Sequence, residues 1–320
     1  MACLRPLQVH NLKKGEKVNF KHYSNGDVAR YDMNKNYIVN DSVPCRKCVG
    51  CRLDNSAEWG VRASLEIKSN PKHNWFVTLT YSDEHLVYNA LGRPNCVPEH
   101  ITKFIKSLRK YFERRGHIGI KYLASNEYGT KRMRPHYHIC FFNLPLDDLE
   151  KTIDSQKGYQ QWTSKTISRF WDKGFHTIGE LTYHSANYTA RYTTKKLGVK
   201  DYKALQLVPE KLRMSKGIGL KYFMENKERI YKEDSVLIST DKGIKRFKVP
   251  KYFDRRMERE WQDEFYLDYI KEKREKVAKR TLFQRQIVSS RSYTDYLGDE
   301  QKKLNNIVKR LTRPLKTGKK

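Results

Sequence analysis

The chain has 320 residues, enough to bury one large domain or two modest ones without a partner. It carries 65 lysines and arginines against 36 aspartates and glutamates, a formal net charge of +29, and such a surface suits a polyanion. No apolar run is long enough to span a bilayer and the start lacks a hydrophobic signal-peptide core, so we expect a cytosolic protein. The basic residues are spread over the whole length, which favours nucleic acid over a membrane surface as the partner.

Three elements are predicted before residue 115, after a polar N-terminal segment of about 55 residues with little periodicity. Residues 55–67 repeat apolar side chains at helical spacing and predict a first helix. Residues 75–82 are β-branched and aromatic, with the larger apolar side chains at alternate positions, and predict a half-buried strand. Residues 101–112 follow the i, i+3, i+4, i+7 rule with lysines and arginines opposite, which predicts an amphipathic helix.

Two further strands are predicted around the turn-rich segment 128–135. Residues 118–127 and 136–142 flank this segment, and the simplest geometry for them is an antiparallel hairpin. In that hairpin Glu127 and His136 face each other.

The second half of the chain is expected to be richer in helices. The sequence predicts a helix within 146–170, a strand at 175–182, and a helix starting near Ser185, whose side chain can cap it. Beyond about residue 198 the chain is lysine-rich, with long helical stretches such as 257–279.

A metal site is predicted on the hairpin. His136 and His138 stand at alternate positions of one strand, so both imidazoles lie on one face, and Glu127 adds a carboxylate from the facing strand. Three ligands on one side leave the other positions open to water or a phosphate oxygen, as in a catalytic site. Two incidental strand histidines are the alternative, but the apolar strand, the facing acid and the basic flank favour a metal. Imidazole ligands suit Zn or Fe better than Mg, so ligand softness does not choose the ion.

A tyrosine stripe is predicted on the helix that follows. Tyr188, Tyr192 and Lys195 stand at i, i+4 and i+7, which places them on one face. A phenol has a pKa of about 10, so nucleophilic attack at neutral pH needs a neighbouring cation or base. Lys195 is placed for that role, and Lys196 is the alternative. The same spacing fits an ordinary helix whose tyrosines pack on a sheet; its combination with the metal strand favours the nucleophile.

The two sites complete each other chemically. A metal polarises a scissile phosphate, a phenolate attacks in line, and the protein becomes esterified to the 5′ phosphate while the 3′ hydroxyl is left free. A second tyrosine can attack again and transfer or close the strand without hydrolysis. The paired tyrosines therefore predict joining as well as cutting.

Three stretches of the sequence carry a family resemblance. They are Phe76-Val77-Thr78-Leu79-Thr80-Tyr81 with Asp83-Glu84-His85-Leu86, then Asn126-Glu127-Tyr128-Gly129 with Arg134-Pro135-His136-Tyr137-His138, and then Tyr188 to Lys196. In order and spacing they resemble the first, metal and tyrosine motifs of the HUH endonuclease superfamily, and specifically of the replication initiators of gokushovirus-type microviruses, which are single-stranded DNA bacteriophages. The N-terminal cysteines and the segment 216–223 are also similar.

The resemblance implies a role for each motif residue. Tyr188 and Tyr192 would be the nucleophiles, Lys195 their basic partner, His136 and His138 the metal ligands, and Glu127 a third ligand. The ion would be Mg²⁺ or Mn²⁺.

The resemblance also implies an α+β fold. It would have a central antiparallel sheet of the ferredoxin-like or RRM-like HUH type with helices packed on it, followed by a basic, largely helical C-terminal extension. We expect three regions: a Cys-containing N-terminal segment with the first helix (1–69), the HUH nuclease core (70–200) and the basic C-terminal region (201–320).

The cysteines suggest a second, structural metal site. Cys45, Cys48 and Cys51 supply three thiolates at a spacing of three, and Cys3 can supply a fourth for a tetrahedral zinc site. An iron–sulfur cluster accepts the same spacing, and reduced thiols without a metal are the third alternative. Two further cysteines, Cys96 and Cys140, are expected to be small core residues.

The favoured interpretation is a rolling-circle DNA replication initiator that nicks one strand at an origin, holds the 5′ end on tyrosine, and later rejoins the strand. Its partners would be the single-stranded DNA origin, the viral double-stranded replicative form, and the host helicase and DNA polymerase, in the cytoplasm of the bacterial host. The chain has no G-x-x-x-x-G-K-[ST] loop, so unwinding is assigned to the separate helicase. One alternative is a non-catalytic single-stranded nucleic-acid-binding protein. Another is a relative that uses the same chemistry in transposition or plasmid mobilisation.

Overall fold

The protein is described by a computed structural model that covers residues 7–9, 41–43, 45–46, 48–129, 132–154, 158–191, 199–241, 243–260, 268–277, 280, 298–299 and 301–307. Its contacts divide the chain into two compact units, one of residues 1–54 with 285–311 and one of residues 55–284 with 312–320. The expected boundaries near residues 69 and 200 stay a prediction.

The first unit contains a short two-stranded sheet. Strands β1 (Leu7–Val9) and β2 (Asp41–Val43) pair antiparallel. The helix α1 (Val49–Ser69) begins in this unit and continues into the second one. Residues 301–307 are also helical, and Leu304 is the buried residue among them.

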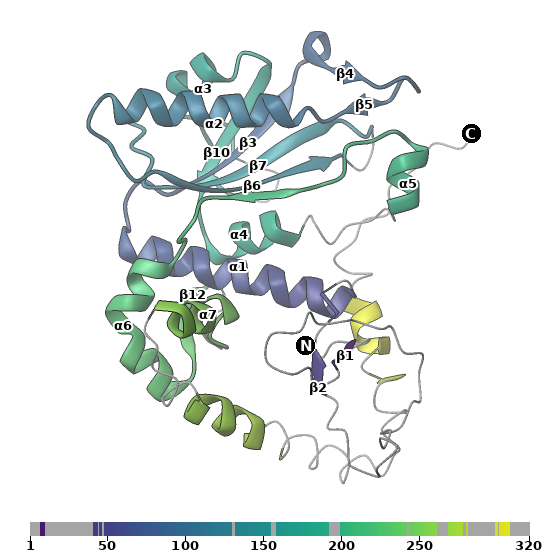
Figure 1. Ribbon diagram of the computed structural model, residues 1–320. Helices are drawn as coiled ribbons and strands as arrows, with labels where there is room; N and C mark the ends of the chain where they lie inside the picture. Colours follow the sequence, from purple (N-terminus) through teal and green to yellow (C-terminus); the bar gives the residue numbers. More distant parts are fainter. Residues whose placement is uncertain are drawn as a thin grey trace. The chain divides into compact units, whose positions relative to one another are not determined.

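The second unit is built on a seven-stranded antiparallel sheet in the order β11-β6-β7-β3-β10-β9-β8 (Figure 1). Its strands are β3 (Trp75–Tyr81), β6 (Lys121–Tyr128), β7 (Pro135–Phe142), β8 (Leu149–Lys151), β9 (Trp162–Ser164), β10 (Gly174–Glu180) and β11 (Leu212–Met214). The helices α2 (Pro98–Glu113) and α3 (Lys165–Phe170) lie on one face, and α4 (Tyr183–Arg191) with α1 lies on the other. Along the chain, β3, α2, β6, β7, α3 and β10 follow the order strand-helix-strand-strand-helix-strand, with short strands inserted between β3 and α2 and between β7 and α3.

The predicted strand and amphipathic helix form the main core. On β3, Val77, Leu79 and Tyr81 are buried at alternate positions, as the period of two requires. The helix α2 starts with a proline in its first turn, where the missing N–H costs no hydrogen bond, and it packs its apolar stripe on β3 and β7. Both expectations are confirmed. None of the helices in the described part of the chain is both long and apolar enough to cross a membrane.

The helix expected within 146–170 was wrong over most of its length. That stretch forms β8, β9 and only the short helix α3. Ser164 explains the late start of α3, because its hydroxyl accepts a hydrogen bond from the Ile167 N–H and so caps the helix there. Asp148 reinforces this cap by accepting from the Ser164 hydroxyl and the Thr166 N–H.

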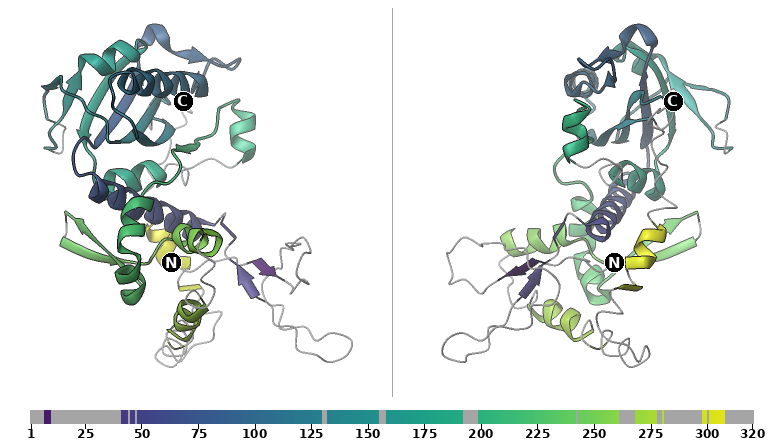
Figure 2. Two further views of the ribbon diagram at one scale, coloured as in Figure 1. Left: turned by 60° about the vertical axis from the view of Figure 1, so that its left-hand side comes forward. Right: turned by 90° about the vertical axis from the view of Figure 1, so that its right-hand side faces the viewer.

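A second hydrophobic core lies on the other side of α1. It is formed by α6 (Leu220–Glu233), β12 (Val236–Thr240), β13 (Gly243–Phe247), α7 (Lys251–Glu260) and the helical residues 268–277, which pack on α1 and on the start of α4. The β12–β13 hairpin projects from these helices (Figure 2). The expectation of long helical stretches beyond about residue 198 was therefore incomplete, because β11, β12 and β13 also lie in that part of the chain. The remaining elements of the unit are η1 (Asp83–His85), β4 (Val87–Tyr88), β5 (Pro94–Asn95) and α5 (Val199–Ala204).

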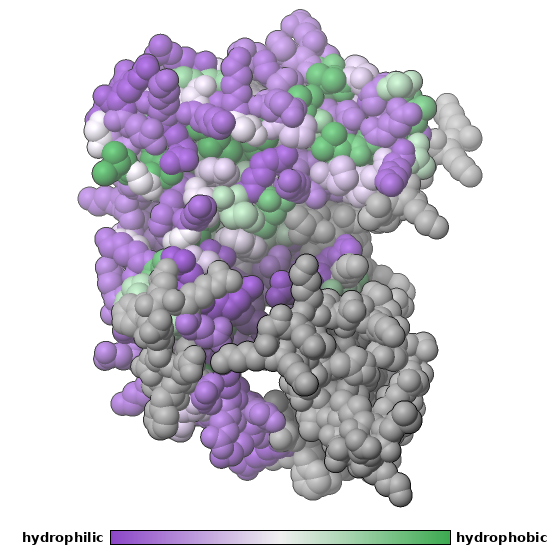
Figure 3. Space-filling model, in the orientation of Figure 1, coloured by the Kyte–Doolittle hydropathy of each residue, from purple (hydrophilic) through white to green (hydrophobic). Residues whose placement is uncertain are grey.

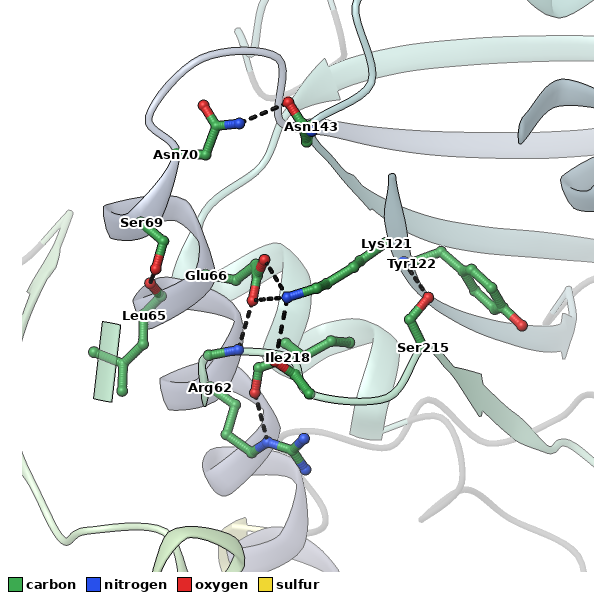
Figure 4. A network of polar contacts seen from close by, with 12 residues as sticks. Arg62, Leu65, Glu66, Ser69, Asn70, Lys121, Tyr122, Asn143, Ser215 and Ile218 are labelled. Atoms are coloured by element: carbon green, nitrogen blue, oxygen red, sulfur yellow. Dashed lines mark hydrogen bonds and ion pairs between the residues drawn. The ribbon is translucent and has the colours of Figure 1, made fainter. Parts of the chain in front are cut away.

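A buried polar network joins α1 to the sheet (Figure 4). The Glu66 carboxylate accepts from Lys121 Nζ, at 2.8 and 3.0 Å, and from the Gly219 N–H at 2.7 Å. Lys121 also donates to the Gly217 carbonyl at 3.3 Å, and Arg62 Nε donates to the Ile218 carbonyl at 3.2 Å. Because Lys121 is the first residue of β6, the network fixes the strand that carries Glu127.

Candidate active site

The sheet face covered by α4 carries the predicted metal ligands. The β6–β7 register places Glu127 opposite His136, as the sequence predicted, and the β7–β3 register places His138 opposite Thr78. Successive side chains on a strand point to opposite faces, so His136 and His138 share the α4 face. Phe76, two residues before Thr78, lies on that face as well, with its ring stacked on His138 at a centroid distance of 5.4 Å.

Glu127, His136 and His138 converge into one group, which we call the metal group. Glu127 Oε2 lies 3.2 Å from His136 Nε2 and 3.2 Å from His138 Nε2. One ligand atom from each residue lies within 4.8 Å of the others. Glu127 is 3% exposed and His138 is 6% exposed, so the group is held in a largely dry setting.

Contacts behind the imidazoles show that this group fits a cation. His136 Nδ1 lies 3.1 Å from the Arg134 carbonyl oxygen, which can only accept, so Nδ1 carries the proton. In the neutral ring, Nε2 then directs a lone pair at the Glu127 carboxylate, an arrangement that a cation between them stabilises. His138 Nδ1 lies 3.1 Å from the Thr78 hydroxyl, and this contact orients the second ring.

The charge of Glu127 is stabilised by its two neighbours. Burial raises the pKa of this carboxyl, but when the two imidazoles are protonated their hydrogen bonds and charge outweigh burial and hold the pKa well below its ordinary range. Glu127 is therefore an ionised ligand at neutral pH.

Tyr188 lies directly beside the metal group. Its ring centroid is 5.3 Å from that of His138 and 6.5 Å from that of Phe76, both in edge-on geometry, and the residue is 36% exposed. A phenol at this position is open to a polymer substrate while it stays next to the metal group. The structure thus brings Tyr188 together with Glu127, His136 and His138.

The helix α4 holds Tyr188 in place through small buried residues. Ala186 and Ala190 are fully buried, and Thr189 contacts Cys140 of β7 with an Oγ1–Sγ distance of 3.4 Å. Small side chains let the helix lie close to the sheet. The predicted cap needs correction. The Thr182 hydroxyl accepts from the Ser185 N–H and the Ser185 hydroxyl accepts from the Thr182 N–H, so the two residues cap the helix reciprocally.

The remaining predicted catalytic residues, Tyr192 and Lys195, and the alternative Lys196 lie outside the described residues. Among the described residues, Arg191 is a cation near Tyr188 that sequence reasoning did not single out. Its guanidinium carbon lies 5.7 Å from the Tyr188 ring centre. Burial lowers the pKa of Arg191, and the charges of Tyr188 and Glu127 oppose that shift. The i, i+3 spacing from Tyr188 was the signal that could have found it.

The cysteine cluster belongs to the first unit. One thiol sulfur each of Cys45, Cys48 and Cys51 lies within 4.8 Å of the others, and the Cys48 N–H donates to Cys45 Sγ at 3.3 Å. These thiols could hold a metal ion, as expected, while Cys3 lies outside the described residues.

The other two cysteines are core residues. Cys96 is 2% exposed and Cys140 is fully buried. Burial raises the pKa of both thiols to about 12, which makes them poor nucleophiles and metal ligands. The expectation of small core residues is confirmed.

Comparison with known proteins supports the resemblance seen in the motifs. Residues 74–197 match the family of the Replication-associated protein ORF2. The chain is 33% identical over 197 residues to the Replication-associated protein VP4 of Bdellovibrio phage phiMH2K, an alignment that covers 62% of this chain and 59% of the relative. It is 30% identical over 219 residues to the Replication-associated protein ORF4 of Chlamydia phage 1, which covers 66% of this chain and 52% of the relative.

These alignments leave part of each protein unmatched. The chain spans little more than half the length of the curated relatives it matches. No solved structure gives a significant match. The metal group and Tyr188 all lie inside the segment 74–197.

Proposed function

The chain belongs to the family of the Replication-associated protein ORF2 through residues 74–197, and on that premise we propose that it is a metal-dependent DNA endonuclease and strand transferase. It nicks single-stranded DNA at a specific site, keeps the 5′ end as a phosphotyrosine, and rejoins the strand to complete rolling-circle replication. The observation that carries this proposal is the position of Tyr188, partly exposed and 5.3 Å from the ring of His138 in the metal group.

The residues of the site have separate roles in the proposed reaction. Glu127, His136 and His138 would hold a divalent cation, which would supply charge stabilisation at the scissile phosphate. The Tyr188 phenol gives its proton to solvent and its oxygen bonds to phosphorus, while the bond from phosphorus to the 3′ oxygen breaks. That 3′ oxygen takes up a proton from solvent and leaves as a hydroxyl. Arg191 stabilises the negative charge on the phenolate and the phosphate.

The reverse reaction closes the strand, because the tyrosine ester keeps the energy of the broken linkage. A free 3′ hydroxyl attacks the phosphotyrosine and releases the phenol. We propose Tyr192 as the second nucleophile and Lys195 as its basic partner. We assign Mg²⁺ or Mn²⁺ to the metal group, and Zn²⁺ to Cys45, Cys48 and Cys51 with Cys3 as the fourth ligand.

The proposed fold is the HUH type, which the order of β3, α2, β6, β7, α3 and β10 supports. The proposed partners are a single-stranded origin and the double-stranded replicative form of a phage genome, with a host helicase and polymerase in the bacterial cytoplasm. A net charge of +29 supports phosphate binding along the chain. Figure 3 shows hydrophilic residues over most of the described surface in that view.

The test is covalent capture of DNA. Overlapping labelled oligonucleotides that tile the phage strand are incubated with the protein and Mn²⁺, and adducts are separated under denaturing conditions. We expect an adduct with one oligonucleotide that requires the divalent ion and is lost in a Tyr188→Phe/Tyr192→Phe double variant.

A matched control lies on the same helix. Tyr183 is buried and its hydroxyl accepts from Asn187, so Tyr183→Phe should keep the adduct. Binding that salt reverses, with no adduct on any oligonucleotide, would instead identify a non-catalytic single-strand binding protein.

A further inference from the structure

A surface depression of about 330 Å³ lies beside the metal group on the sheet. It is lined by Thr80, Tyr81, Ser82, Asp83, Arg134 and Phe175. Its volume is at the lower end of the range of about 300–1,000 Å³ that small-molecule sites occupy. Among the described residues that line it, there is no member of the metal group and no Tyr188, so it is a separate feature of the same face.

Phe175 is the unusual residue of this depression. It is 70% exposed, although it lies within a strand of the central sheet, between neighbours β3 and β9. Single exposed apolar side chains are common and alone mean little. The placement of Phe175 is what matters, since it lies opposite Thr80, and Thr80 lies opposite His136 on the next strand.

That register puts the Phe175 ring on the face of the metal group. Paired residues of neighbouring strands point to the same side of a sheet, so Phe175, Thr80 and His136 share one face. Strands lie about 4.8 Å apart, which places the backbone of Phe175 roughly 10 Å from that of His136. A nucleotide next to the one whose phosphate sits at the metal group can reach across this distance.

The backbone beneath Phe175 is firmly held. The Thr80 hydroxyl donates to the Phe175 carbonyl at 3.2 Å, and the Ser82 N–H donates to the Lys173 carbonyl at 2.9 Å. Gly174 has a φ of +149°, and a Cβ there would overlap the backbone of Thr80 and Ser82, so the strands approach as closely as glycine allows. The ring is thus exposed but mounted on a rigid strand, which reduces the entropy lost on binding.

The walls of the depression suit a base better than a phosphate. Asp83 brings a carboxylate that is 84% exposed, which repels phosphate but can accept from the amino groups of a base. Arg134 pairs with Asp83 and donates to the Tyr81 carbonyl at 2.8 Å, so its charge is already partly offset. The Arg134 carbonyl also holds His136, which links this wall to the metal group.

We propose that this depression binds one unpaired base of the DNA substrate, next to the scissile linkage, by stacking it on the Phe175 ring. The proposal rests on the proposed nicking function for its substrate. Stacking orients the strand so that the neighbouring phosphate reaches the metal group and Tyr188. Aromatic stacking tolerates every base, so Phe175 supplies affinity and register, while Asp83 and the hydroxyls of Thr80 and Ser82 supply base preference.

The first test measures binding without cleavage. Fluorescein-labelled (dT)12 is titrated with the full chain at fixed salt and without divalent ion, and the anisotropy gives the affinity. Stacking on an aromatic residue is worth about 5- to 150-fold in affinity per base, and we expect Phe175→Ala to lose that factor while Phe175→Trp keeps it. Tyr159→Ala is the matched control, because Tyr159 is 68% exposed and precedes β9 toward the opposite end of β10.

The second test locates the base directly in the unmodified protein. (dT)12 with single 5-iodouracil substitutions is photo-crosslinked, and the attached peptide is sequenced by mass spectrometry. We expect the crosslink at Phe175 or a neighbour in the depression. Crosslinks confined to other parts of the chain, or unchanged affinity in Phe175→Ala, would overturn the proposal.

The two proposals fail in different ways. In one outcome the unmodified protein forms the covalent adduct, and Phe175→Ala binds and cleaves DNA as well as the unmodified protein. The nicking function then stands and the base site is wrong. If no adduct forms on any oligonucleotide but Phe175→Ala weakens binding, the nicking function is wrong and a base-stacking site remains.

Discussion

The buried pair of Glu66 and Lys121 offers a quantitative test of how the metal-bearing strand is held (Figure 4). The Glu66 side chain is 10% exposed. After the Lys121→Met change, the donor that remains to its carboxylate among the described hydrogen bonds is the Gly219 N–H. Removing one partner of a fully buried pair costs about 3–5 kcal/mol. Lys121 is 26% exposed, so water screens the pair, and we expect a loss of about 2–3 kcal/mol in the free energy of unfolding.

The Glu66→Gln change separates charge from hydrogen bonding. Glutamine keeps an acceptor for the Gly219 N–H but loses the charge, so the double variant with Lys121→Met should cost less than the sum of the two single changes. We expect a coupling energy of about 1–2 kcal/mol.

The assay is urea unfolding of the full chain followed by tryptophan fluorescence. Three tryptophans, Trp75, Trp162 and Trp171, lie in or beside the central sheet. Lys165→Met is the control. Both side chains of the Lys165–Glu150 ion pair are largely exposed, so this change should leave the urea midpoint unchanged. If Lys121→Met lowers the free energy of unfolding by less than about 0.5 kcal/mol, the network does not hold β6 as argued.

Three other contacts give expected outcomes of their own. Gly219 has a φ of +76°, and a Cβ there would lie 2.6 Å from a carbonyl oxygen of α1. Gly219→Ala should therefore lower the melting temperature far more than Gly217→Ala, because a Cβ at Gly217 meets open space. Equal shifts in the two variants would contradict this. His176 accepts a hydrogen bond from the Ser164 N–H and burial lowers its pKa, so the unfolded chain takes up a proton first as the pH falls. The free energy of unfolding should therefore decline as the pH drops below about 6.5, and it should decline less in His176→Leu than in the unmodified protein. An identical pH slope in the two proteins would count against this role of His176. Thr78→Val removes the hydroxyl behind a metal-group imidazole and should weaken Mn²⁺ binding about 10- to 100-fold in calorimetry, and unchanged binding would exclude that role.

The parts of the fold that depend on local pattern could be predicted from the sequence. The period of two on β3 and the stripe on α2 are set by residues close together in the chain, and both were identified. The pairing of Glu127 with His136 also followed, because a short turn leaves a hairpin little choice of register. These features were enough to assemble the metal group.

The parts that depend on distant pairing could not be predicted. β11 joins the sheet beside β6 across more than 80 residues, and no local pattern indicates that. The stretch 146–170 carries too few apolar residues for its pattern to distinguish a helix from strands. The helix starts where Ser164 caps it, and no apolar period marks that position. Phe175 reads as an ordinary strand residue until the β3–β10 register places it beside the metal group.

The most direct measurement of the central claim is the identity of the residue joined to DNA. The adduct formed in Mn²⁺ is digested with protease and nuclease, and the peptide that carries the residual nucleotide is sequenced by mass spectrometry. The account predicts the nucleotide on Tyr188 or Tyr192, and none when His138→Ala is used. A nucleotide on any other residue, or full adduct formation by His138→Ala, would contradict it.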